Sequence, residues 1–217
     1  NSKYNLSMVG LRKKYPDNIF LMSGLHPCYV DSNYPEEISV VEDILNLDKS
    51  IVAIGEIGID LHWDKSNLDI QLKAFKRQII LANDFGLPIV IHCRESFDEI
   101  YNVLNKLPAK NGGIFHCFTG TLNQANKIIS MGMKIGIGGV VTFKNANVIQ
   151  ECATQCPKDA FMLETDSPYL APVPFRGKRC EPMHVKNTAE FIANLRGISL
   201  EEIGACTNRN ADSFFEF

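Results

Sequence analysis

The chain has 217 residues, of which 45% are hydrophobic and 22% are charged, which excludes a fibrous or disordered chain and favours one globular core. Its formal net charge of -3 excludes the uniformly basic surface that sequence-independent nucleic-acid binders usually carry. No stretch approaches the roughly 18 to 20 apolar residues of a membrane span, and the N-terminus lacks a signal pattern, so we expect a soluble protein. We also expect a monomer.

Short apolar runs rich in β-branched residues alternate along the chain with longer stretches of helical periodicity. Strands are expected at 19–24, 51–55, 88–92, 113–116, 134–138 and 160–164. Helices are expected at 66–85, 95–107, 121–131, 145–156, 182–196 and 199–215, and the proline-rich residues 170–182 are expected to form a long loop. These six strand-helix units predict an α/β architecture around a parallel sheet, in a single domain over residues 1–217.

Six units satisfy an open doubly wound sheet, whereas the most familiar α/β barrel needs eight. Two observations favour the barrel: polar residues follow several different strands, and no G-x-G-x-x-G fingerprint follows the first strand. We therefore predict a TIM (β/α)8 barrel that lacks about the first one to two βα units. A segment upstream of Asn1 would supply the further strands.

The seven cysteines are odd in number and irregularly spaced, so they predict no disulfide framework. A reducing cytoplasm suits them best. Cys93 and Cys117 each follow a histidine, but alternation along a strand points neighbours to opposite faces. Both are interpreted as small packing residues, and Cys152 and Cys156 are not assigned to a site.

Four predicted strands finish in side chains that bind metals, namely Glu56, His92, His116 and Asp166. A parallel barrel brings the carboxyl ends of its strands to one face, so these residues could converge on an ion. Two imidazoles and two carboxylates suit zinc, manganese or magnesium. The alternative for each histidine alone is a hydrogen-bonded core residue, but the same placement occurs four times. Asp166 and Glu56 are also the candidate catalytic residues, Asp166 by orienting or deprotonating a water.

Three cationic or ring-bearing positions are candidate substrate contacts. His26 follows the first strand, Arg94 lies two residues beyond His92, and Arg179 belongs to a loop with Arg176 and Lys178. Arginine pairs well with phosphate, although a plain loop or a solvated cation is the alternative at each position. His62 and Trp63 could form a wall that stacks a ring or base, or could simply pack under a loop.

Six motifs together resemble the TatD family of metal-dependent deoxyribonucleases: GLHP at 24–27, GEIGID at 55–60, IHCRE at 91–95, FHCFTG at 115–120, ETDSPYLAP at 164–172 and RGKR at 176–179. They occur in order along nearly the whole chain. The resemblance implies an amidohydrolase-type TIM barrel, two divalent metal ions and hydrolysis of DNA phosphodiester bonds by a metal-activated water. It places the family's shared carboxylate at Glu56, its histidine ligands at His92 and His116, and its strand-end aspartate at Asp166.

The chain departs from the family pattern because no His-x-His pair occurs among its five histidines. We expect this pair to lie upstream of Asn1. The leading hypothesis is thus a TatD-like deoxyribonuclease. One alternative keeps the metallohydrolase scaffold but acts on a small phosphoester, lactone or amide, since loops set the function of a barrel. The other is a non-catalytic binding protein, which gains support if the pair is truly absent.

Overall fold

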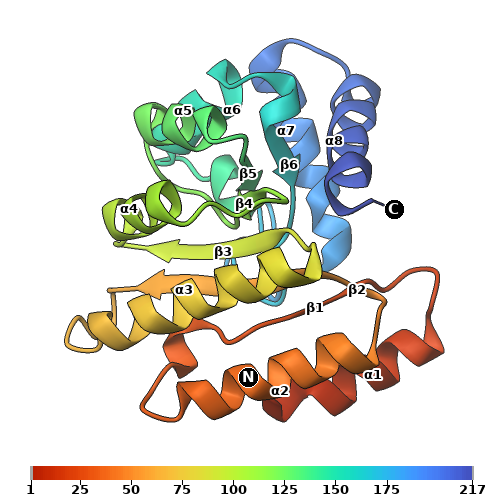
Figure 1. Ribbon diagram of the computed structural model, residues 1–217. Coiled ribbons are helices and arrows are strands. Elements are labelled where there is room, and N and C mark those ends of the chain that lie inside the picture. Colours follow the sequence, from red (N-terminus) through yellow and green to blue (C-terminus); the bar gives the residue numbers. More distant parts are fainter. Residues whose placement is uncertain (1, 217) are drawn as a thin grey trace. The chain divides into compact units, whose positions relative to one another are not determined.

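The computed structural model describes residues 2–216 of the chain (Figure 1). Its internal contacts divide the protein into two compact units, one ending at Gly113 and the other beginning at Ile114. Within the described residues, none of the helices combines the length and the apolar character that crossing a bilayer requires.

The N-terminal unit consists of parallel strands with helices between them. Its sheet has the order β1-β2-β3, and all of its pairings are parallel. Helix α3 packs against β2 and against α2, as Figure 1 shows in yellow and orange. The elements are η1 (Ser2–Tyr4), α1 (Asn5–Lys14), β1 (Leu21–Ser23), η2 (Pro27–Tyr29), α2 (Tyr34–Leu47), β2 (Ile51–Asp60), α3 (Leu68–Phe85), β3 (Ile89–Arg94) and α4 (Phe97–Lys106).

Helix α3 follows the predicted amphipathic pattern closely. Its buried positions recur at helical spacing and include Phe75 and Ile79. The helix stops where predicted, because Gly86 adopts a left-handed conformation with φ of 70° that residues with a β-carbon seldom take. At the other end Asn67 is the N-cap residue, although its side chain makes no capping hydrogen bond.

Strand β2 is longer than the sequence predicted. The predicted strand ended at Gly55, but β2 continues to Asp60 and pairs with β3 as far as Arg94. The extension forms because Ile57 and Ile59 are buried, with a register irregularity between Ile54 and Ile57. Glu56 therefore lies inside β2, and the strand ends in a different carboxylate, Asp60.

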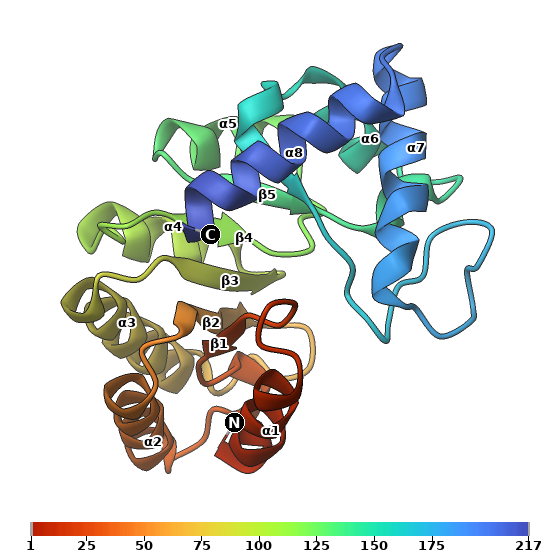
Figure 2. The ribbon, with the colours of Figure 1, turned by 90° about the vertical axis from the view of Figure 1, so that its right-hand side faces the viewer.

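The C-terminal unit contains the other three strands, in the order β4-β5-β6 and again parallel. Helix α8 packs against β6 and α7, and Figure 2 shows α8 and α7 in blue. The elements are β4 (Gly113–Phe115), α5 (Leu122–Ser130), β5 (Lys134–Ile137), η3 (Gly139–Thr142), α6 (Asn147–Gln155), η4 (Lys158–Ala160), β6 (Phe161–Leu163), η5 (Pro182–His184), α7 (Val185–Arg196) and α8 (Leu200–Phe215).

Most of the predicted elements form within a few residues of their expected ends. The expected loop lies between β6 and η5. The predicted helix at 182–196 is divided into η5 and α7, because Pro182 opens a short turn in which Glu181 and His184 form a reciprocal cap. Helices α1 and α2 were not among the predicted helices.

Gly58 lets β2 approach β3 closely. Its φ is 139°, and a β-carbon at this position would collide with the carbonyl oxygen of His92. Only glycine avoids both the conformational strain and the collision. The position of His92 in the sheet thus depends on the absence of a side chain at Gly58.

Replacing Gly58 with alanine should lower the free energy of unfolding by about 1–3 kcal/mol or more, because the new methyl group strains the backbone and meets β3. Urea unfolding measures the change. The matched control is Gly204→Ala in α8, where a β-carbon would meet no atom within 4 Å. That control should stabilise the protein by about 0.4–1 kcal/mol. Equal stability of the two variants would contradict the argument.

Candidate active site

Three side chains of the N-terminal unit converge from three segments. His26 follows β1, Glu56 lies in β2 and His92 in β3. His26 Nε2 is 3.2 Å from His92 Nδ1 and 3.7 Å from Glu56 Oε2, and His92 Nδ1 is 4.0 Å from the same oxygen. The donor atoms of all three lie within 4.8 Å of one another, so the chemistry of the set fits a divalent metal ion.

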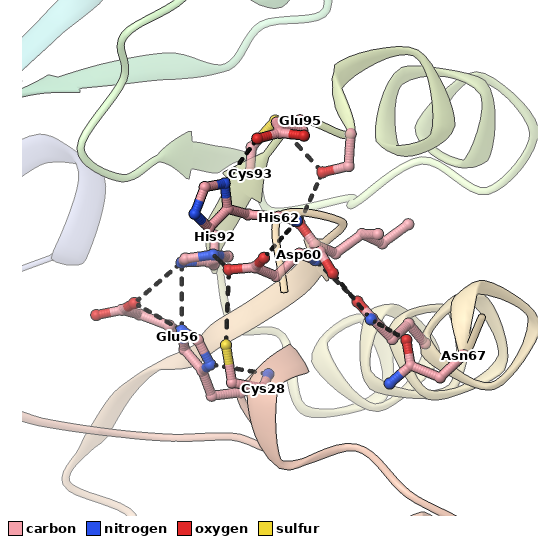
Figure 3. A network of polar contacts seen from close by, with 12 residues as sticks. Cys28, Glu56, Asp60, His62, Asn67, His92, Cys93 and Glu95 are labelled. Atoms are coloured by element: carbon pink, nitrogen blue, oxygen red, sulfur yellow. Dashed lines mark hydrogen bonds and ion pairs between the residues drawn. The ribbon is translucent and has the colours of Figure 1, made fainter. Parts of the chain in front are cut away.

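Asp60 is the buried support of this cluster (Figure 3). Its side chain is only 3% exposed, and its Oδ2 lies 2.9 Å from His92 Nε2. Oδ1 accepts the backbone N–H of His62, and the Cys28 thiol donates to Oδ2. Burial opposes ionisation, but the hydrogen bonds from His92 and His62 outweigh it and hold the pKa of Asp60 below its ordinary value. Asp60 is thus a carboxylate that accepts hydrogen bonds.

The carboxylate of Asp60 fixes the tautomer of His92. Because Asp60 accepts a hydrogen bond from Nε2–H, the lone pair of neutral His92 lies on Nδ1. This nitrogen faces Glu56 and His26. Histidines that bind metals commonly donate their other ring N–H to a carboxylate, so His92 is oriented as a ligand.

His26 is oriented differently. Its Nδ1 accepts the backbone N–H of Cys28 at 3.2 Å, so the proton of the neutral ring lies on Nε2. That N–H points toward His92 Nδ1. Binding a metal through Nε2 would require His26 to lose its hydrogen bond with Cys28. The position of His26 fits a metal ligand. The proton on its Nε2, however, suits a hydrogen-bond donor to an anionic oxygen.

The C-terminal unit contains a second histidine held by a carboxylate. His116 Nδ1 lies 2.8 Å from Glu164 Oε2, and the other oxygen of Glu164 accepts the backbone N–H of Cys117. His116 Nε2 then presents its lone pair toward Asp166 Oδ1, 3.5 Å away. Gly136 makes room for Glu164, since a β-carbon there would lie 2.5 Å from the Glu164 carboxyl group. His116 and Asp166 form a second pair of donors suited to a cation.

The four predicted ligands are therefore found as two pairs, one in each unit. Glu56 and His92 lie together in the N-terminal unit, and His116 and Asp166 in the C-terminal unit. Their role as ligands stays a prediction. Sequence reasoning assigned no role to Asp60 or Glu164, which orient the histidines. A signal existed for Glu164, because it directly follows β6 and lies two residues before the predicted ligand Asp166.

The other predicted substrate residues are more exposed. Arg94 is the last residue of β3, and its guanidinium lies 5.5 Å from the ring centre of Trp63. Arg179 is exposed in the loop before η5. Cys93 fits the predicted packing role, since burial raises the pKa of its thiol to about 11 and keeps it protonated.

The sequence profile described as "TatD related DNase" matches residues 1–216 of the chain. The chain belongs to the TatD family. Among its TatD relatives, a protein named uncharacterized metal-dependent hydrolase YabD, from Bacillus subtilis, is 42% identical over 200 residues, which are 92% of this chain and 78% of the relative. The similarly named YcfH of Escherichia coli is 34% identical over 202 residues, 92% of this chain and 74% of the relative.

Solved structures of TatD proteins share the fold. The crystal structure of the TatD homologue YjjV from Escherichia coli matches 100% of this chain and 83% of its own, with a TM-score of 0.94 and 26% identity. A TatD family hydrolase from Entamoeba histolytica matches 96% of this chain and 80% of its own, with a TM-score of 0.78 and 22% identity. The predicted α/β fold of the TatD type, with a parallel sheet and alternating helices, is thereby confirmed.

Membership of the TatD family also confirms the prediction of a metal-dependent hydrolase, an enzyme of the class that acts on ester bonds. The His26, Glu56 and His92 cluster agrees with this class, because its nitrogen and oxygen donors suit a divalent ion.

Replacing Asp60 with asparagine should lower the affinity for Mn²⁺ by about 10- to 100-fold. An asparagine NH₂ facing His92 Nε2 would shift the imidazole proton to Nδ1, the nitrogen expected to bind the metal. Isothermal titration calorimetry measures the affinity. Asp64→Asn is the control, because Asp64 is exposed and caps a turn with Ser66. An unchanged affinity in Asp60→Asn would refute the orienting role.

His26→Ala and His92→Ala should differ in the same titration. We expect His92→Ala to lower Mn²⁺ affinity by at least about 10-fold, because it removes a ligand. His26→Ala should leave the affinity nearly unchanged, because its Nε2 carries a proton. Comparable losses in both variants would show that His26 is a metal ligand after all.

Proposed function

We propose that the protein hydrolyses phosphodiester bonds in DNA with the help of two divalent metal ions, Zn²⁺, Mg²⁺ or Mn²⁺. One observation carries the proposal: each unit holds a histidine whose one ring nitrogen is paired with a carboxylate and whose other faces an acidic side chain. Membership of the TatD family supports DNA as the substrate class.

Glu56 and His92 would bind one ion, and His116 and Asp166 would contribute to the binding of another. When bound, such ions lower the pKa of water, polarise the phosphate and neutralise charge that develops on it. Asp60 and Glu164 hold the two imidazoles in the required tautomers. These pairs fix the donor atoms before the substrate arrives.

Three side chains of the protein would act directly on the water, the metal ions or the phosphate. Asp166 is the candidate general base, because a carboxylate oxygen can orient a water and accept its proton. Glu56 is the second candidate catalytic carboxylate, and its negative charge would hold cations in the cluster. His26 Nε2–H would donate to a nonbridging phosphate oxygen, since hydrogen bonds to charged oxygens are strong.

Charge also favours a polyanionic substrate once the metals are present. Two dications would add about +4 to a chain with a formal charge of -3. Arg94 and Arg179 are exposed cations that could contact phosphates outside the metal site. A small phosphoester, lactone or amide would use the metals but would leave these cations without a role.

We propose that the protein is located in the cytoplasm. All seven cysteines are free thiols, four of them buried. Unpaired cysteines persist best in a reducing compartment.

Activity on single-stranded DNA should require a divalent ion and should disappear with a chelator. Asp166→Asn should lower kcat by about 100-fold or more, since a lost general base alone costs about 10²- to 10⁴-fold. The control is Asp212→Asn, an exposed position in α8. Release of nucleotides is measured beside turnover of phosphoester, lactone and amide panels. Metal-dependent turnover of a panel compound with DNA left intact would contradict DNA as the substrate. Binding of DNA without turnover of any compound would contradict catalytic activity.

A further inference from the structure

Trp63 is the only tryptophan of the chain, and it is 75% exposed. It lies three residues beyond Asp60, the last residue of β2, in the turn that leads to α3. Large aromatic side chains are usually well buried, because exposing an indole to water is unfavourable. Trp63 thus presents its indole to solvent close to the site.

Neighbouring side chains hold the Trp63 indole. The His62 ring meets it edge to face, with ring centres 4.9 Å apart and planes at 82°. His62 is itself fixed, because its Nδ1 lies 2.7 Å from Glu95 Oε1, and Lys65 pairs with the other oxygen of Glu95 at 3.7 Å. His62 is also held through its backbone N–H, which donates to Asp60. The indole is thus exposed and well supported.

Arg94 places a positive charge beside the exposed Trp63 indole, which we call the stacking platform. Its guanidinium carbon lies 5.5 Å from the Trp63 ring centre, within the range of a cation–π contact. Arg94 and the candidate ligand His92 are two residues apart on β3, so they face the same side, about 6.6 Å apart along the strand. A ring surface and a cation thus adjoin the metal cluster of the same unit.

We propose that Trp63 stacks an unpaired nucleobase of the substrate while Arg94 contacts the phosphate next to it. This inference rests on the proposed function and adds to it a requirement for a single-stranded or frayed end, because a base inside a duplex already stacks on its neighbours. Aromatic stacking with a nearby cation is the usual way of holding single strands without reading their sequence. The polar and charged side chains around Trp63 argue against an apolar protein partner.

The fluorescence of Trp63 reports stacking directly, since no other tryptophan contributes. The protein, kept metal-free with a chelator and then loaded with Ca²⁺, is titrated with a short oligothymidylate. Stacking should quench the emission. An oligomer of equal length with abasic residues keeps the phosphates but should not quench, and a blunt duplex should quench much less. Equal quenching by the abasic oligomer would overturn the inference.

Substitutions give a second readout that does not depend on fluorescence. Trp63→Ala should raise the Kd for oligothymidylate by about 5- to 100-fold, and Trp63→Phe should restore most of the affinity. Neither should change the Kd for the abasic oligomer or the affinity for Mn²⁺. Val148→Ala is the control, an exposed apolar residue of α6. An unchanged Kd in Trp63→Ala would refute stacking.

The two proposals fail separately in these experiments. Quenching and base-dependent affinity without any hydrolysis would support stacking on Trp63 and contradict the proposed nuclease activity. Metal-dependent DNA hydrolysis with the same kcat/KM in Trp63→Ala would retain the nuclease and overturn the platform.

Discussion

The N-terminal site depends on one buried carboxylate placed between three segments of the chain. Asp60 accepts hydrogen bonds from a histidine of β3, from a thiol in η2 and from the backbone just beyond its own strand. An anion removed from water is stable only when such donors replace its hydration. The donors thereby order the segments that carry His26 and His92. Local folding and the protonation of the site are therefore governed by the same contacts.

The same arrangement recurs in the C-terminal unit with different residues. Glu164 replaces the hydration of its carboxylate with the His116 imidazole and the backbone N–H of Cys117. In both units the partner of the histidine is a carboxylate, and an acidic side chain lies near its other nitrogen. Carboxylate oxygens with imidazole nitrogens beside them form donor sets that suit a divalent cation.

The sequence was most informative where a local pattern decides the structure. Apolar runs located the strands, and helical spacing with Gly86 located α3. It was less informative where distant contacts decide. Strand β2 extends past its glycines only because β3 lies beside it. Helix α1 has an interior glycine, and none of its side chains for which burial is described is buried. Residue types and strand positions suggested metal ligands, but no local pattern shows which carboxylate will face which ring nitrogen, so Asp60 and Glu164 had no predicted role.

Two strand glycines and two helical glycines of the protein differ in their prospects for engineering. Gly58 and Gly136 lie against atoms that belong to the site, so a methyl group at either position would move β3 or Glu164. Gly10 and Gly204 lie in helices with open space around them. Thermal resistance can thus be increased by restricting the unfolded chain at helical glycines, while the strand glycines stay fixed. Stabilising substitutions are therefore restricted in the strands that carry the site, whereas the helices can accept them.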